Sequence, residues 1–177
     1  GNTALPNPST IRLGITADGQ LKLHQGATDI GQGSNTVITQ ICADALGLPL
    51  ADFELVGPDT ALTPDCGKTS GSRQTFITGK AAELSGRQLR ADILRLSNMS
   101  DDATIRLEGA TVTISEAGAT HRIELADMPV DEFGYVLRAE ESFDPPTVPL
   151  DENGQGTPYA VYGYGAQIAE IEVDLRL

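Results

Sequence analysis

Two glycine-rich segments hold the residue types in this chain that could bind a ligand. The first, residues 26–33, reads Gly-Ala-Thr-Asp-Ile-Gly-Gln-Gly and stands directly before a predicted helix. Its glycines permit positive φ angles and a close approach of the backbone to a ligand. The N-terminus of the helix would add unpaired N–H groups, which bind anions. In physical terms this segment is a cradle for a phosphate or a pterin.

The second segment, residues 67–74, reads Gly-Lys-Thr-Ser-Gly-Ser-Arg-Gln and also precedes a predicted helix. Its small hydroxylated side chains and its amide supply many hydrogen bonds at low bulk. A polar ligand with phosphate and amide edges would therefore suit both segments.

Each segment taken alone has simpler interpretations. A glycine-rich turn before a helix is more often only a turn, and Lys68 and Arg73 could be ordinary solvated charges. Neither segment matches a standard nucleotide motif, because Thr36 occupies the position of the last glycine of GxGxxG and Gly67-Lys68 lacks the earlier glycine of a P-loop. The chemical signal lies in the pair of segments, in this order and at this spacing.

The elements that must position these segments can be read from the hydrophobic pattern. Alternation in 11–15 and 21–23 around Asp18-Gly19 predicts a hairpin, and 53–56 reads as a short strand. A helix is predicted over 34–46, capped by Ser34 and ended by Gly47, because its apolar residues fall on one stripe. A second, longer helix is expected over 73–97.

The second half of the chain changes to period-2 runs. Strands in 103–125 predict a β-hairpin insertion, within residues 100–130. Residues 144–158 hold four of the ten prolines and should form an ordered loop or linker, followed by a long strand over 159–175. The expected fold is α+β, with two principal helices packed on a mainly antiparallel sheet, since the turns are too short for repeated βαβ crossovers.

Composition excludes several function classes. With 12 basic and 25 acidic residues, a net charge of −13 argues against a nucleic-acid-binding or anionic-membrane surface. Two cysteines and two histidines provide neither a disulfide framework nor zinc-ligand spacing, which mildly favours the reducing cytoplasm. No apolar run approaches the roughly 20 residues that cross a bilayer.

The two segments together carry a family resemblance. The strings GATDIGQG (residues 26–33) and TSGSRQTFITGKA (residues 69–81) closely resemble the large, molybdopterin-binding subunit of the xanthine oxidase family of molybdenum hydroxylases. Residues 162–174 extend the similarity, which covers about half of the chain. The rival hypotheses are a free-standing phosphate- or nucleotide-binding module without molybdenum, and a structural domain whose loops are merely turns.

The resemblance implies a set of binding residues. Gln32 matches a family glutamine that contacts the pterin dithiolene and phosphate region together with the backbone of a neighbouring glycine. The second segment matches the loop that holds the pterin dinucleotide, and Lys68 and Arg73 look closer to bacterial members, which usually carry the cytosine form. The predicted cofactor-binding residues are Gly31, Gln32, Gly33, Thr69, Ser70, Gly71, Ser72, Arg73 and Gln74.

The resemblance also implies that other parts of the enzyme supply the catalytic residue and the electron-transfer centres. The family activates a metal-bound hydroxide with a glutamate in a Gly-Glu context that is missing here, and Glu170 and Glu172 read as a polar strand face, so we predict no catalytic and no metal-ligating residue. Two cysteines cannot hold an iron–sulfur cluster. Residues 1–177 are therefore expected to be part of the molybdopterin-binding domain of a larger chain, working with its remaining domains and with iron–sulfur and flavin partners. The missing initial Met agrees with a fragment, which alone should be empty of cofactor and inactive.

Overall fold

The computed structural model describes residues 6–160 and 166–176, and its centre is a four-stranded sheet. Strand β1 (Ser9–Ile15) pairs antiparallel with β2 (Leu21–His24) on one side and with β7 (Leu137–Phe143) on the other. Strand β3 (Phe53–Val56) lies beyond β2 and runs parallel to it. The order β3-β2-β1-β7 places β1, whose Ile11, Leu13 and Ile15 are completely buried, in the middle of the sheet.

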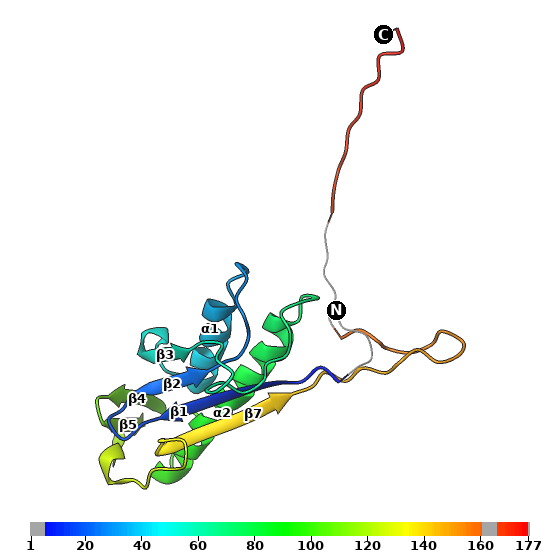
Figure 1. Cartoon of the computed structure of the whole chain (residues 1–177). Helices are drawn as coiled ribbons and strands as arrows, with labels where there is room; N and C mark the ends of the chain where they lie inside the picture. Colours follow the sequence, from blue (N-terminus) through cyan, green and yellow to red (C-terminus); the bar gives the residue numbers. More distant parts are fainter. Residues whose placement is uncertain (1–5, 161–165, 177) are drawn as a thin grey trace.

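Two helices pack together against this sheet (Figure 1). Helix α1 (Ser34–Leu46) and helix α2 (Gly79–Ser97) contact each other, and α2 also contacts β1 and β7. A single π-helical turn, Gln74–Thr78, leads into α2. Short 3-10 turns occupy Leu50–Asp52 and Leu125–Asp127. The buried side of each helix contributes Ile38, Cys42, Leu46, Leu89 and Ile93 to the core between helices and sheet.

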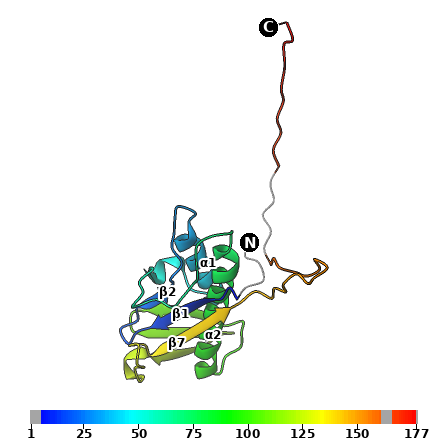
Figure 2. The same ribbon diagram turned by 45° about the vertical axis from the view of Figure 1, so that its right-hand side comes forward.

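A second, three-stranded antiparallel sheet extends the same core. It consists of β4 (Thr104–Glu108), β5 (Thr111–Glu116) and β6 (Ala119–Glu124), with β5 in the centre. Its Ile105, Val112 and Ile114 belong to the same hydrophobic cluster as Leu89 and Ile93 of α2. Figure 2 shows the ribbon from a second side, with α1 and α2 beside the strands β1 and β7. The strands expected in 103–125 are thus present, as a three-stranded meander instead of a hairpin.

Most of the predicted elements are confirmed, and the class is α+β with a mainly antiparallel sheet. The hairpin, the strand at 53–56 and the helix over 34–46 are all present, and Gly47 ends that helix at φ 82° as a left-handed C-cap. The second helix starts six residues later than predicted, because the π-helical turn intervenes. Strand β7 is an element that the sequence analysis does not predict, because Leu137 and Ala139 are its only buried apolar residues and the charged pair Glu140 and Glu141 follows them.

The prediction of a strand over 159–175 is wrong for the residues that the structure describes. Residues 161–165 lie outside the described part, and neither 159–160 nor 166–175 forms a strand. Ile168 is 99% exposed and Leu175 is 93% exposed, so the alternating apolar residues have no sheet neighbour here. The proline-rich segment 144–158 is a loop, closed by an isolated bridge between Val148 and Thr157. Among the described helices, none has the length and apolar character needed to span a membrane.

Helices α1 and α2 approach each other closely at Gly86, which gives a first prediction. A Cβ atom added there would lie 2.7 Å from the Cys42 carbonyl oxygen and 2.9 Å from Ala45 Cβ. Alanine improves helix propensity by about 1 kcal/mol, but overpacking costs about 1–3 kcal/mol, so Gly86→Ala should lower the free energy of unfolding of the chain, measured by urea denaturation.

Gly79 provides the matched control on the same helix. A Cβ there would meet only the flexible end of the Ile41 side chain, at 2.8 Å. Gly79→Ala should therefore leave the unfolding free energy unchanged or raise it slightly. If Gly86→Ala is as stable as Gly79→Ala, the packing argument is wrong.

Candidate functional site

The first glycine-rich loop connects β2 to α1 and is held by a carboxylate of its own. Asp29 Oδ1 accepts hydrogen bonds from the N–H groups of Gly31 (2.8 Å) and Gly33 (3.3 Å), and Oδ2 accepts one from Asn35 (3.2 Å). These hydrogen bonds favour the ionised carboxylate and hold the pKa of Asp29 below its usual value. The bond from Gly31 contributes most to this effect. The N-cap residue of α1 is thus Gly33 and not the predicted Ser34, and Asp29 caps the helix from within the loop by accepting from Gly33 and Asn35.

This capping changes what the loop can offer to a ligand. The sequence predicts that the start of α1 presents free N–H groups to an anion, but Asp29 occupies two of them, those of Gly33 and Asn35. Within residues 6–160 and 166–176, the N–H groups of Gln32 and Ser34 still have no hydrogen-bond partner. The loop can thus donate from the backbone at these two positions, while the helix terminus itself is neutralised by the chain.

The Gln32 side chain braces the same loop. Its Oε1 accepts from the Ile30 N–H at 2.7 Å, and its Nε2 donates to Ser34 Oγ at 3.1 Å and to the Thr28 carbonyl at 3.3 Å. The residue is nevertheless exposed on its outer side. Gln32 can therefore present its amide to a ligand only by sharing or exchanging these bonds.

The second loop is shaped by two consecutive left-handed residues. Gly71 has φ 60° and Ser72 has φ 57°, and Ser72 is one of three non-glycine residues with positive φ in the described chain. For a residue with a Cβ this conformation costs about 1 kcal/mol. The π-helical turn follows at Gln74, and such turns recur at functional sites. Ser72 and the exposed Ser70 make no side-chain hydrogen bond among the described residues, so their hydroxyls are available.

Arg73 is not a solvated charge but is 2% exposed, beneath this loop. All five of its N–H groups have protein acceptors. Nε donates to Asn7 Oδ1 (2.8 Å), one terminal nitrogen to the carbonyls of Cys66 and Lys68, and the other to those of Asn7 and Pro8. Burial lowers the pKa of the guanidinium, but Arg stays charged in proteins. Its side chain therefore fixes the loop and has no donor left for a ligand.

Gln74 and Thr69 join the two loops. Gln74 Nε2 donates to Thr69 Oγ1 at 3.0 Å, and Thr69 Oγ1 donates to the Thr28 carbonyl of the first loop at 2.7 Å. Gln74 is also buried, with its other amide atom bonded to Thr78. The spacing between the loops is thus set by direct hydrogen bonds, although 41 residues separate Thr28 from Thr69.

The loops enclose a pocket of about 490 Å³. This volume is in the usual range for small-molecule sites, about 300–1,000 Å³. Seven of the nine predicted residues line the pocket, and Gly31 and Gly33 do not; both have positive φ, which shapes the first loop without placing them on the wall. The complete lining is Ile30, Gln32, Thr69, Ser70, Gly71, Ser72, Arg73, Gln74 and Thr75.

The chemistry of this lining fits a polar, flat ligand. Small side chains and Gly71 leave room for close approach, exposed Ile30 provides one apolar surface, and hydroxyl, amide and backbone groups provide hydrogen bonds. No cluster of His, Cys, Asp or Glu able to hold a metal ion occurs in the described part of the chain.

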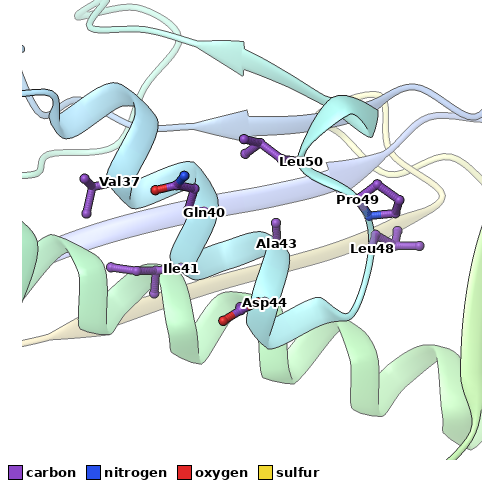
Figure 3. Close-up of a pocket in the computed structure, with 8 residues that line it drawn as sticks. All are labelled: Val37, Gln40, Ile41, Ala43, Asp44, Leu48, Pro49 and Leu50. Carbon is purple, nitrogen blue, oxygen red and sulfur yellow. The ribbon is translucent and has the colours of Figure 1, made fainter.

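A larger cavity of about 580 Å³ lies on another side of α1 and suits such a ligand less well (Figure 3). Val37 and Ile41 from α1 and Leu48, Pro49 and Leu50 from the following segment form mostly apolar walls, with Gln40 and Asp44 as the polar side chains. None of the predicted site residues lies there, and no glycine-rich loop approaches it. We therefore take the pocket between the two loops as the candidate site.

The sequence analysis did not identify the residues that hold the two loops in place beneath the pocket. Asp29 gave no capping signal, because it lies four residues before the N-cap Gly33 and the preference for Asp applies to the N-cap itself. The roles of Thr28, Ser9 and Thr78 had no signal, since they depend on contacts between distant segments.

Cys66, just before the second loop, is buried. Its sulfur accepts a hydrogen bond from the Gly26 N–H and donates one to the Thr10 carbonyl, both at 3.1 Å. Desolvation raises the pKa of its thiol.

Comparison with known proteins assigns the family. The model of the molybdopterin cofactor-binding domain matches residues 1–177, and the chain belongs to this family. The free-standing nucleotide module proposed as an alternative finds no support in these comparisons.

The relatives are named as xanthine dehydrogenases and aldehyde oxidoreductases. The chain is 28% identical over 175 residues to the xanthine dehydrogenase molybdenum-binding subunit of Escherichia coli O157:H7, covering 94% of this chain and 22% of that subunit. It is 28% identical over 174 residues to the aldehyde oxidoreductase of Megalodesulfovibrio gigas, covering 96% and 17%. The crystal structure of the aldehyde oxidoreductase from Desulfovibrio desulfuricans has the same fold, with a TM-score of 0.65 and 24% identity over 90% of this chain and 15% of that one. The chain thus spans about a fifth of the length of these proteins.

Arg73 yields a prediction about the site's foundation. Lysine keeps the positive charge but has only three N–H donors for the five acceptors that Arg73 satisfies. Arg73→Lys should therefore lower the free energy of unfolding by about 2–4 kcal/mol. Amide hydrogen exchange in residues 66–72 should also become faster. The control is Arg95→Lys, because Arg95 is an exposed residue that pairs only with Asp92. Equal unfolding free energies for the two variants would show that the buried guanidinium is replaceable.

Proposed function

We propose that the pocket between the two glycine-rich loops holds part of a molybdopterin dinucleotide in an oxidoreductase that hydroxylates aldehydes or N-heterocycles with oxygen from water. The observation that supports this most directly is that two loops 41 residues apart meet at one polar pocket, in a domain of the molybdopterin-binding family. The bound cofactor would supply the redox chemistry of the metal, and this chain would supply binding and orientation.

The roles of the predicted residues divide into two kinds. Gln32, Ser70, Ser72 and the backbone around Gly71 would touch the cofactor, since they border the pocket and keep free or exchangeable hydrogen-bonding groups. Gly31 and Gly33 would shape the first loop. Thr69 would face the ligand and also tie the loops, whereas the guanidinium of Arg73 and the amide of Gln74 would act mainly by fixing the second loop.

The rest of the enzyme would come from other polypeptide. The proposed partners are the remaining domains of the same large subunit and iron–sulfur and flavin domains or subunits that carry electrons away. We propose the cytosine form of the dinucleotide, supported by the resemblance of Lys68 and Arg73 to bacterial members. A cytoplasmic location is supported by the two buried, free cysteines, Cys42 and Cys66.

The loop assignment is tested by cofactor loading in the full-length polypeptide. Gln32→Ala and Ser72→Ala each remove a hydrogen-bonding group, at a cost of about 1–3 kcal/mol. That energy corresponds to roughly 5- to 150-fold weaker binding. Gly71→Val should reduce loading further, because a branched side chain would enter the approach path and disfavour φ 60°. Molybdenum and pterin content per folded polypeptide are the measurements.

Gln40→Ala is the matched control for these variants. Gln40 is an exposed glutamine on α1 that faces the other cavity, so its loss should leave cofactor content at the parent level. Circular dichroism excludes unfolding as the cause of a loss. Parent-level loading in the Gln32, Ser72 and Gly71 variants together would show that the loops are structural turns.

The 177-residue chain expressed alone should bind no stoichiometric molybdenum and oxidise neither aldehydes nor purines. The pocket has one open side that other domains would have to cover, and a cofactor contacted on one side dissociates readily. Metal analysis and an oxidation assay on the folded chain check this expectation. About one molybdenum per chain would contradict the proposed sharing of the site.

A further inference from the structure

A directional chain of hydrogen bonds runs from the core strand β1 to the candidate pocket. Thr78 donates its only hydroxyl proton to Gln74 Oε1, so its contact with Ser9 Oγ at 2.7 Å must be one that Ser9 donates. Gln74 Nε2 then donates to Thr69 Oγ1 at 3.0 Å, and Thr69 donates to the Thr28 carbonyl at 2.7 Å. Every proton along the chain is assigned, in the order Ser9, Thr78, Gln74, Thr69, Thr28.

The pocket is reached only by the two residues that precede Thr28 in this chain. Thr69 and Gln74 line it, whereas Ser9 and Thr78 are completely buried beneath and do not. The Thr78–Gln74 bond also spans the π-helical turn, because these residues are its last and first members. The buried hydroxyls are therefore connected to the loops by side chains, although neither can touch a ligand.

The chain fixes the orientation of the Gln74 amide. A carboxamide can be turned over at little steric cost, so its orientation depends on what its two ends meet. The Thr78 hydroxyl donates to the amide oxygen of Gln74, so this oxygen must lie on the side of Thr78. The NH₂ group then lies on the other side and donates to Thr69. Without that hydroxyl, Gln74 Oε1 would be a buried acceptor with no donor, and turning the amide would bring its oxygen toward Lys68 O and Thr69.

We propose that Ser9 and Thr78 are positioning residues for the cofactor, which act through Gln74 and Thr69 to fix the spacing of the two glycine-rich loops. The inference rests on the proposed function of the pocket. It adds two residues that lie outside the pocket and outside both loops. Their substitution should change cofactor binding without changing any group that the cofactor contacts.

The main test is Thr78→Val in the full-length polypeptide, since valine keeps the shape and removes the hydroxyl. We expect cofactor affinity, followed by molybdenum and pterin content at limiting cofactor, to fall about tenfold, in line with the loss of a buried hydrogen-bond donor. Amide exchange at residues 69–72 of the cofactor-free polypeptide should become faster. Thr78→Ser, which restores the hydroxyl, should restore both properties.

Ser85→Ala is the matched control for a buried hydroxyl on α2. Ser85 is completely buried and donates to the Ile11 carbonyl of β1 at 3.0 Å, but it has no connection to the loops. It should reduce stability while leaving loading of the folded polypeptide and loop exchange at parent values. Equal losses of loading in Ser85→Ala and Thr78→Val would overturn the proposal, because general destabilisation would explain both.

A double-mutant cycle tests the route through Thr69. If Thr78 acts through that residue, Thr78→Val should weaken binding much less in a Thr69→Val background than in the parent, whereas independent effects would add. Additive effects would overturn the proposed route. If Thr78→Val fails to fold, Ser9→Ala interrupts the same chain at its start, and parent-level loading and exchange in that variant would overturn the proposal.

The outcomes separate this inference from the function of the pocket. Loss of cofactor in Gly71→Val and Gln32→Ala, with parent-level loading and exchange in Thr78→Val, would leave the pocket assignment in place and remove the positioning role. Parent-level loading in the Gly71 and Gln32 variants would instead remove the pocket assignment. In that case faster loop exchange in Thr78→Val would show a hydrogen-bond chain that organises loops without serving this cofactor.

Discussion

The buried guanidinium of Arg73 is the interaction on which the arrangement of the site depends. A charge removed from water must be matched by hydrogen bonds, and Arg73 obtains them from Asn7, Pro8, Cys66 and Lys68. Its five donors thereby hold together the residues just before β1 and both ends of the second loop. Gly67 belongs to the same contact, because a Cβ there would lie 2.8 Å from the guanidinium. The loop can carry small, exposed, flexible residues because its base is fixed by one rigid, planar group.

The fold brings the two loops to one place by means of its central hairpin. Strand β2 leads directly into the first loop, and β1 starts beside the residues that hold the second. Helix α1 begins where the first loop ends, and α2 follows the second loop after one π-helical turn. The two helices pack against each other at Gly86 and its neighbours. Because the helices cannot separate without opening the core, the loop ends cannot separate either. Hydrophobic packing thus sets the coarse position of the pocket, and hydrogen bonds between Thr28, Thr69 and Gln74 set its detail.

Polar side chains of the candidate site hold the loops in position as often as they are available to contact a ligand. Asp29 and Gln32 both lie in a loop with the composition of a ligand-binding loop, but both side chains form hydrogen bonds within the loop itself. A loop that carries its own hydrogen bonds is ordered before a ligand arrives, so less conformational freedom is lost on binding. The same groups are then less available to the ligand, and Ser70, Ser72 and the backbone become the more direct contacts.

The sequence by itself determined the elements whose signals are local. The stripe of apolar residues over 34–46 and the glycine at position 47 predicted α1 to the residue. Alternation predicted the hairpin of β1 and β2, and the short strand predicted at 53–56 is β3. The two glycine-rich strings identified the family and seven residues of one pocket. The burial of Arg73 and the place of Ser9 and Thr78 behind Gln74 emerge only in the folded chain, because these roles come from partners far apart in the sequence. The same reason explains the wrong strand prediction at 159–160 and 166–175. Alternation there indicates that a segment can form a strand, but a strand forms only when another strand provides the hydrogen bonds.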